Sequence, residues 1–163
     1  MRKLRIYLDT TVISYLDQPE RGERHRATHR LWEKLKAKEF DVVVSTTTTE
    51  ELERCANPKR MVLMEYLSQV EHSVIPSDSV VEQVAGRFID FGILKQKSFE
   101  DCQHIAAALI GNCDVVVSWN FRHIVHLDTM RGVKLVATAE GYRDLIICTP
   151  NALIGGDPDD NTP

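Results

Sequence analysis

The chain contains one five-residue run twice, and this feature limits the possible folds more than any other. DVVVS occurs at Asp41–Ser45 and again at Asp114–Ser118. Three consecutive valines favour an extended strand, and because they do not alternate with polar residues, both faces of such a strand must be covered. Helices packed on both faces are typical of parallel sheets. The two runs therefore predict two strands inside a parallel sheet.

Shorter apolar runs and helical patterns alternate with these two strands. Apolar residues three and four positions apart predict amphipathic helices, and Ser98 is a suitable N-cap for one of them. Alternation of strand and helix predicts an α/β fold, a three-layer α/β/α sandwich around a mostly parallel sheet. The other expected strands are Leu4–Leu8, Ser73–Ile75 and Leu145–Cys148, and the expected helices are Glu23–Lys38, Ser79–Phe91, Ser98–Ile110 and a stretch near Asp128–Glu140.

Length and composition predict one ordinary globular domain. The 163 residues suit a single domain over residues 1–154, and the acidic, turn-forming residues 155–163 are expected to be a flexible tail. No apolar run is long enough for a membrane span, and no secretory signal is evident at the start. The four cysteines show no metal-binding spacing, which favours reduced thiols and a cytoplasmic location. The net charge of −4 argues against nucleic-acid binding by bulk positive charge, although a metal and a local basic patch would still permit it.

Polar side chains follow the ends of several expected strands. Ligands of parallel sheets gather beyond the carboxyl ends of the strands, so these residues are candidates for a shared site. Asp114 is excluded because it begins its strand and must lie at the opposite edge. The candidates are Asp9, the pair Glu50 and Glu51, Asp101 and Asn120.

Helical periodicity separates the two adjacent glutamates. Each residue advances about 100° around a helix, and Leu52, Cys55 and Ala56 define the stripe that is expected to face the core. Glu50 lies nearly opposite this stripe and should face water, whereas Glu51 borders it and should reach the cleft. Clustered carboxylates repel one another when empty, but they suit Mg²⁺ or Mn²⁺, which prefer carboxylate oxygen and retain water ligands.

Four stretches of the chain, taken in order, resemble the PIN-domain family of small metal-dependent ribonucleases, which includes toxins of bacterial toxin–antitoxin pairs. The matching stretches are IYLDTTVISYL (Ile6–Leu16), VSTTTTEEL (Val44–Leu52), DCQHIAAAL (Asp101–Leu109) and DVVVSWNFRHI (Asp114–Ile124). The later TPNAL (Thr149–Leu153) resembles the closing strand and turn of the family.

The resemblance implies which residues form the active site. Asp9, Glu51 and Asp101 match the first three acidic positions of the family and would hold one or two Mg²⁺ or Mn²⁺ ions. Asn120 matches the fourth position, where the family usually has an acid; its amide carries no charge but still offers an oxygen ligand. The implied reaction is hydrolysis of RNA phosphodiesters by a water that the metal activates.

Several neighbours of these residues are candidates for supporting roles. The hydroxyls of Thr11 and Ser118 are placed to orient a carboxylate or water, or they are ordinary turn hydroxyls. His104 lies three residues after Asp101, where it would hold that carboxylate, touch phosphate or simply pack against the helix. Arg122 lies near the cleft and is a candidate for phosphate contact. The aromatic residues Trp119 and Phe121 would either stack on a base or pack in the core.

The resemblance also implies partners, namely an RNA substrate, an antitoxin protein and a second copy of the chain in a homodimer. The main alternative is a catalytically weak PIN-like module that binds RNA or a protein. In this interpretation, Asn120 at the fourth acidic position marks an active site that has lost a catalytic acid. A third possibility, a phosphatase or receiver domain with Asp9 as its phosphorylated residue, fits less well. That pattern requires a second Asp two residues later, where this chain has Thr11.

Overall fold

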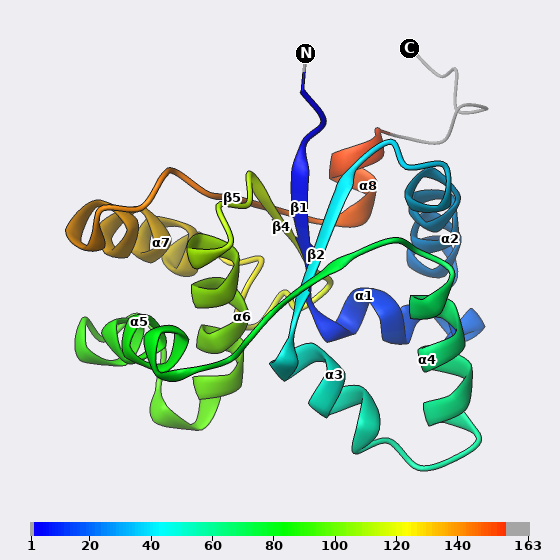
Figure 1. The fold of residues 1–163 in the computed structure, drawn as a ribbon, viewed down its shortest axis with the longest axis horizontal. Helices are drawn as coiled ribbons and strands as arrows, with labels where there is room; N and C mark the ends of the chain where they lie inside the picture. Colours follow the sequence, from blue (N-terminus) through cyan, green and yellow to red (C-terminus); the bar gives the residue numbers. More distant parts are fainter. Residues whose placement is uncertain (1, 156–163) are drawn as a thin grey trace.

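The computed structural model describes residues 2–155, in which five strands form a single parallel sheet (Figure 1). The strand order is β3-β2-β1-β4-β5, so the first strand lies at the centre. Every neighbouring pair is parallel, which confirms the predicted sheet. The strands are β1 (Arg5–Leu8), β2 (Asp41–Ser45), β3 (Ser73–Ile75), β4 (Val115–Val117) and β5 (Ile146–Cys148).

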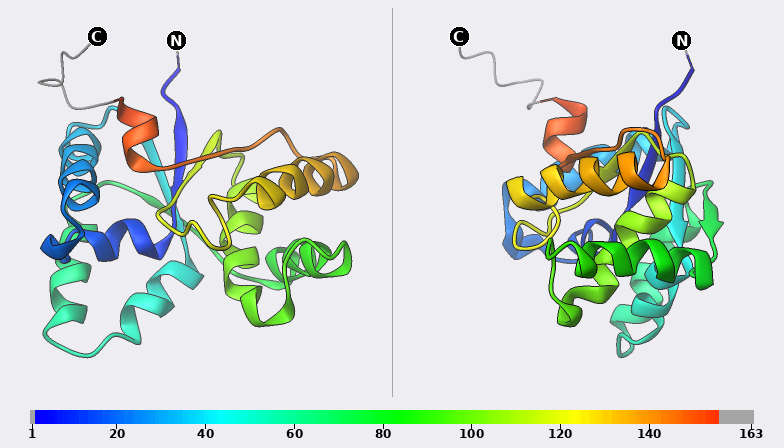
Figure 2. Two further views of the ribbon diagram at one scale, coloured as in Figure 1. Left: turned by 180° about the vertical axis from the view of Figure 1, so that it is seen from behind. Right: turned by 90° about the vertical axis from the view of Figure 1, so that its left-hand side faces the viewer.

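Helices connect the strands and cover both faces of the sheet, which confirms the predicted three-layer sandwich (Figure 2). One layer holds α5, α6 and α7, and the other holds α1 to α4 and α8. The helices are α1 (Thr10–Tyr15), α2 (Glu23–Lys36), α3 (Thr46–Glu53), α4 (Lys59–Ser68), α5 (Ser79–Asp90), α6 (Phe99–Ile110), α7 (Leu127–Glu140) and α8 (Pro150–Ile154).

The central strand contributes to two hydrophobic cores. Ile6 and Leu8 pack into the core beneath α1, α2 and α4, whereas Tyr7 packs into the core beneath α5, α6 and α7. This division follows from the two-residue alternation of side chains along a strand. Val42 and Val44 of β2 likewise belong to the first core and Val43 to the second. The triple-valine runs are therefore buried on both faces, as their sequence predicts.

Two expectations about these elements are wrong, and a third is correct only in part. Helix α2 ends at Lys36 rather than Lys38, because Lys38 adopts a left-handed conformation with φ of 60°. Ser98 is the N-cap residue of α6, as predicted, but its side chain makes no capping hydrogen bond; a 3-10 turn over Gln96–Ser98 leads into the helix. The TPNAL stretch forms helix α8, since the hydroxyl of Thr149 accepts the N–H of Ala152 and starts a helical turn.

The core-facing stripe expected after Glu51 is only partly correct. Leu52 is buried, but α3 ends at Glu53 and Ala56 is exposed beyond it. Helix α4 was not expected, because its apolar residues do not gather on one side. Leu63 and Leu67 face the core while Met61, Val62 and Met64 are exposed.

The opposite edge of the sheet is closed by charged groups. Asp114 accepts two hydrogen bonds from the guanidinium of Arg2, at 2.7 and 2.8 Å, and one from the backbone N–H of Arg5. Its position far from the strand carboxyl ends agrees with its exclusion from the site. Among the helices of residues 2–155, none is long and apolar enough to cross a membrane. The expected tail falls almost wholly outside the described residues.

Candidate functional site

Asp9 lies where the central strand ends and α1 begins. Its carboxylate serves as the N-cap of α1 and accepts the backbone N–H of Val12. The hydroxyls of Thr11 and Ser118 each donate to it at 2.6 Å, one to each oxygen. The residue is buried, and burial raises the pKa of Asp9 more than these donors and nearby His104 lower it. The two predicted hydroxyls thus orient this carboxylate.

Glu51 reaches the same edge from α3, while its neighbour Glu50 is exposed, as the helical periodicity predicted. The Oε1 atom of Glu51 lies 2.7 Å from Nε2 of His104 on α6. The other ring nitrogen of His104 lies 2.6 Å from the hydroxyl of Tyr7. His104 therefore holds Glu51 rather than Asp101, and it links the site to the central strand.

The buried His104 and the partly buried Glu51 stabilise each other's charge. Burial alone would lower the pKa of His104, but hydrogen bonding to Glu51 and the negative charges of Glu51, Asp9 and Asp101 raise it. Burial likewise opposes ionisation of Glu51, yet the bond and charge of His104 lower its pKa. The imidazolium form is favoured, and in that form both ring nitrogens donate hydrogen bonds.

Asp101 enters the site from the first turn of α6. Its Oδ1 accepts a hydrogen bond of 3.2 Å from the side-chain amide of Asn120, which follows β4. The amide oxygen of Asn120 accepts the backbone N–H of His123, so this residue also shapes the loop after the strand. Sequence reasoning placed Asn120 as an oxygen ligand, whereas here its N–H₂ group faces the carboxylate.

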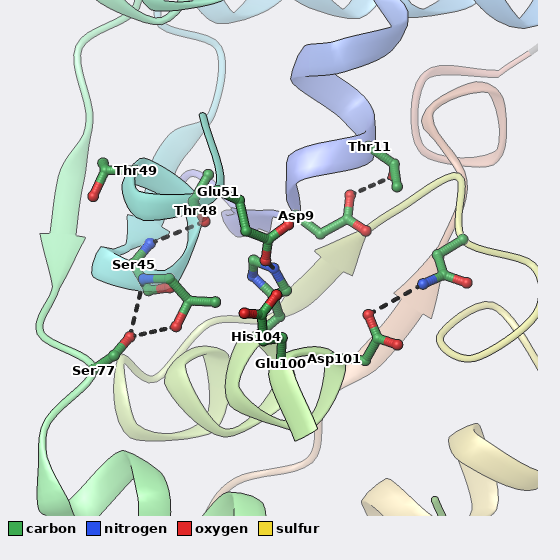
Figure 3. A network of polar contacts seen from close by, with 12 residues as sticks. Asp9, Thr11, Ser45, Thr48, Thr49, Glu51, Ser77, Glu100, Asp101 and His104 are labelled. Carbon is green, nitrogen blue, oxygen red and sulfur yellow. Dashed lines mark hydrogen bonds and ion pairs between the residues drawn. The ribbon is translucent and has the colours of Figure 1, made fainter. Parts of the chain in front are cut away.

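The acidic side chains from β1, α3 and α6 gather at one edge of the sheet (Figure 3). Burial raises the pKa of Asp101; nearby His104 and His123 oppose this, while the charges of Asp9 and Glu51 add to it. Asp9 and Glu51 therefore both disfavour the charge of Asp101. The three acids lie at the edge where the strand ends placed them, while a metal ion shared by all three stays a prediction.

The donor chemistry fits a hard divalent cation, although the side chains do not form a complete metal site. Within residues 2–155, no group of three or more His, Cys, Asp or Glu side chains has the geometry to hold a metal ion. Each carboxylate is instead held by donors of its own. Mg²⁺ usually takes one or two protein carboxylates together with water and substrate phosphate, so the residues present are sufficient in kind.

Sequence reasoning missed two residues that shape the site. Tyr7 anchors His104 through its hydroxyl, which also contacts the hydroxyl of Ser45 at 2.7 Å. A signal for it was present, because Tyr7 lies two residues before Asp9 and must share its face of the strand. Arg24 lies over the ring of Phe121 at 4.6 Å, a contact between distant segments with no signature in the sequence.

Comparison with known proteins places this fold among PIN domains. The family model of the PIN domain matches residues 6–125. A chain of the VapBC2 complex of Rickettsia felis, solved with a DNA fragment from its promoter, is similar with a TM-score of 0.55 and 13% identity, covering 90% of this chain and 98% of that one. Mycobacterium tuberculosis VapC20, a toxin that cleaves the sarcin–ricin loop, is similar with a TM-score of 0.53 and 21% identity, covering 68% and 86%. No curated protein matches in sequence. Because the family model spans most of the chain, the protein belongs to the PIN domain family.

Proposed function

We propose that this PIN domain is an endoribonuclease that hydrolyses RNA phosphodiesters with the help of Mg²⁺ or Mn²⁺. The observation that supports this most is the gathering of Asp9, Glu51 and Asp101 at one edge of the sheet, where their charges repel. Such repulsion is relieved by a divalent cation. When bound, the ion supplies activation of a water and neutralises charge on the scissile phosphate.

The chain's own residues then hold the acidic groups in position. Thr11 and Ser118 fix both oxygens of Asp9, so this carboxylate has little freedom to turn. The imidazole of His104 fixes Glu51. Asn120 donates to Asp101, and we assign it an orienting role at the fourth position of the site. Arg122 is exposed beside this site and is available for a phosphate oxygen.

We further propose that the protein is the toxin of a toxin–antitoxin pair, acting in the cytoplasm as a homodimer that an antitoxin protein binds. Family membership supports this proposal, and so does the fold likeness to a VapBC complex and to an RNA-cleaving VapC toxin. Co-expression with a candidate antitoxin, followed by co-purification, is the direct test of this partnership.

The activity is tested with the purified full chain, labelled RNA and Mn²⁺. We expect cleavage that EDTA abolishes, and we expect Asp9→Asn to slow it at least about a hundredfold, since it removes a metal-binding charge while keeping the shape of the side chain and one of its two acceptor oxygens. Asp114→Asn is the matched control, because Asp114 lies at the opposite edge of the sheet; it should cleave like the wild type. Cleavage that persists in Asp9→Asn would contradict the assignment.

A catalytically weak module that binds RNA or a protein is the second candidate. The observation that favours it is Asn120 itself, whose uncharged amide already bonds Asp101 and the N–H of His123. The same experiment separates the two functions, because this module would retain RNA on a filter without cleaving it in Mn²⁺ or Mg²⁺.

A further inference from the structure

A row of aromatic rings extends outward from the site. The rings of Tyr15 and Trp119 stack with centroids 5.6 Å apart and planes at 9°, and Phe121 follows Trp119 at 6.1 Å. Trp119 is 4% exposed, whereas Phe121 is 41% exposed. The row is therefore anchored in the core at one end and open to solvent at the other. Core packing accounts for Trp119 but not for Phe121.

Two arginines lie against this row. Arg21 is 4.8 Å from the centre of the Tyr15 ring, and Arg24 is 4.6 Å from that of Phe121. A guanidinium that rests on a ring keeps its N–H groups free for a phosphate or a base. The rings and Arg21 line a pocket of about 460 Å³, which we call the aromatic pocket.

The aromatic pocket opens directly onto the candidate active site, since Glu51 and Asn120 belong to its wall. On the other side of the loop that follows β4 lies a second pocket of about 290 Å³, here called the lysine pocket. Arg122 lines both pockets and joins them. The basic side chains of the lysine pocket are Lys95, Lys97, Arg122, His123 and His126, and Asp128 is the acidic residue of its wall.

Most of the cations of these two pockets lack an acidic partner, although His126 lies 4.0 Å from Asp128. Within residues 2–155, neither the arginines at the aromatic row nor Lys95, Lys97 and Arg122 form an ion pair. Cations elsewhere are of both kinds. Arg2, Arg30 and Lys38 have carboxylate partners, whereas Arg131 and Lys134 form no ion pair within the described residues. Because the chain is acidic overall, unpaired cations around the site favour an anionic ligand there.

We propose that the two pockets form one groove for a single strand of RNA, with an unpaired base stacked at Phe121 and the backbone continuing past Arg122 into the lysine pocket. This inference rests on the proposed function and assigns the residues that hold the strand, with Phe121 as the stacking platform and Arg122, Lys95 and Lys97 as phosphate contacts. Exposed aromatic rings stack on any base whose face is free, whereas a paired base in a duplex is already stacked. Lysines and arginines then neutralise successive phosphates.

The groove is tested by fluorescence anisotropy of a labelled RNA of about 12 nucleotides, a length in the range that single-strand binding sites span. Binding to the full chain is measured in EDTA, so that the proposed metal-dependent cleavage does not occur. We expect the single strand to bind at least about tenfold more tightly than the same strand annealed to its complement. Phe121→Ala should weaken binding of the single strand roughly five- to a hundredfold. Phe91→Ala is the matched control, since Phe91 is 46% exposed at the end of α5 and lines neither pocket, and it should bind like the wild type.

The lysine pocket is tested by salt dependence. Lys95→Ala with Lys97→Ala should flatten the slope of log Kd against log salt by about 0.7 for each phosphate that these lysines neutralise. Arg131→Ala with Lys134→Ala on α7 removes the same charge from side chains that line neither pocket, and should leave the slope closer to that of the wild type. Equal affinity for single strand and duplex, or equal binding by the Phe121 and Phe91 variants, would overturn the inference.

Cleavage assays separate this inference from the proposed function. If the wild type cleaves RNA and Phe121→Ala cleaves with unchanged KM, the groove is wrong while the nuclease stands. If the wild type binds single strands through Phe121 but never cleaves, the groove stands and the nuclease is wrong. Far-UV circular dichroism and a melting curve for each variant confirm that it is folded.

Discussion

At the scale of single residues, His104 connects helix α6 to helix α3 and to the central strand, which its place in the sequence does not suggest. Its two ring nitrogens contact Glu51 and Tyr7 inside the protein, at 2.7 and 2.6 Å. Removing the ring leaves the partly buried carboxylate of Glu51 and the buried hydroxyl of Tyr7 without that partner. We expect His104→Ala to lower the free energy of unfolding by about 2–4 kcal/mol, measured by urea denaturation.

The matched control for this prediction is His72→Ala. His72 is partly exposed and bonds only the nearby carbonyl of Val70, so its loss should change the unfolding free energy by less than about 1 kcal/mol. If both variants unfold at the same urea concentration, the hydrogen bonds of His104 do not stabilise the fold.

The sequence predicted the acidic residues of the site better than their partners. Asp9 and Glu51 were found because strand ends and helical periodicity follow from local patterns. The bond from His104 to Glu51 joins residues 53 positions apart, and it exists only because α3 and α6 pack over the same sheet. The cation contact of Arg24 with Phe121 is likewise created by folding and has no local signal.

At the scale of secondary structure, two helical glycines give opposite predictions. A Cβ at Gly132 in α7 would lie 2.5 Å from Cγ2 of Ile93, so Gly132→Ala must push that side chain out of its packed position. A Cβ at Gly86 in α5 meets no atom within 4 Å. We expect Gly132→Ala to destabilise the fold by about 1–2 kcal/mol and Gly86→Ala to stabilise it by about 0.5–1 kcal/mol, because alanine favours a helix.

Thermal melting of the two variants checks this contrast, and a higher melting temperature for Gly132→Ala would show that α7 and the segment before α6 are not tightly packed.

The strands of this protein were predictable because runs of valine strongly favour the extended conformation. Helix ends were less so: Lys38 takes a left-handed conformation that its residue type does not signal, and the exposed methionines of α4 obscure its amphipathic pattern.

At the scale of the whole molecule, the negative charge of an aspartate has opposite effects on stability at the two edges of the sheet. At the carboxyl ends of the strands, burial and the neighbouring carboxylates raise the pKa of Asp101, so its charge destabilises the fold. At the other edge, the hydrogen bonds of Arg2 lower the pKa of Asp114 to about 2, so its charge stabilises the fold. The molecule therefore keeps an unfavourable charge where the site is and a favourable one where it is not.

This contrast predicts opposite shifts for the same substitution in EDTA at neutral pH. Asp101→Asn should raise the melting temperature, since the amide removes the repelled charge and still accepts the hydrogen bond of Asn120. Asp114→Asn should lower stability by about 1 kcal/mol, a figure reduced for solvent screening because Arg2 is largely exposed. Mn²⁺ should stabilise the wild type and Asp114→Asn more than Asp101→Asn, because ligand binding favours the folded state.

The pH dependence of the unfolding free energy tests whether the charge of Asp114 stabilises the fold. Because the folded pKa is about 2 and the ordinary value is 3.8, the stabilisation is complete well above pH 4 and is lost as the pH falls from about 4 towards 2. The difference in unfolding free energy between wild type and Asp114→Asn should therefore be largest near neutrality and shrink over that interval. A difference that stays constant down to pH 2, or a lower melting temperature for Asp101→Asn in EDTA, would contradict these opposite roles of charge at the two edges.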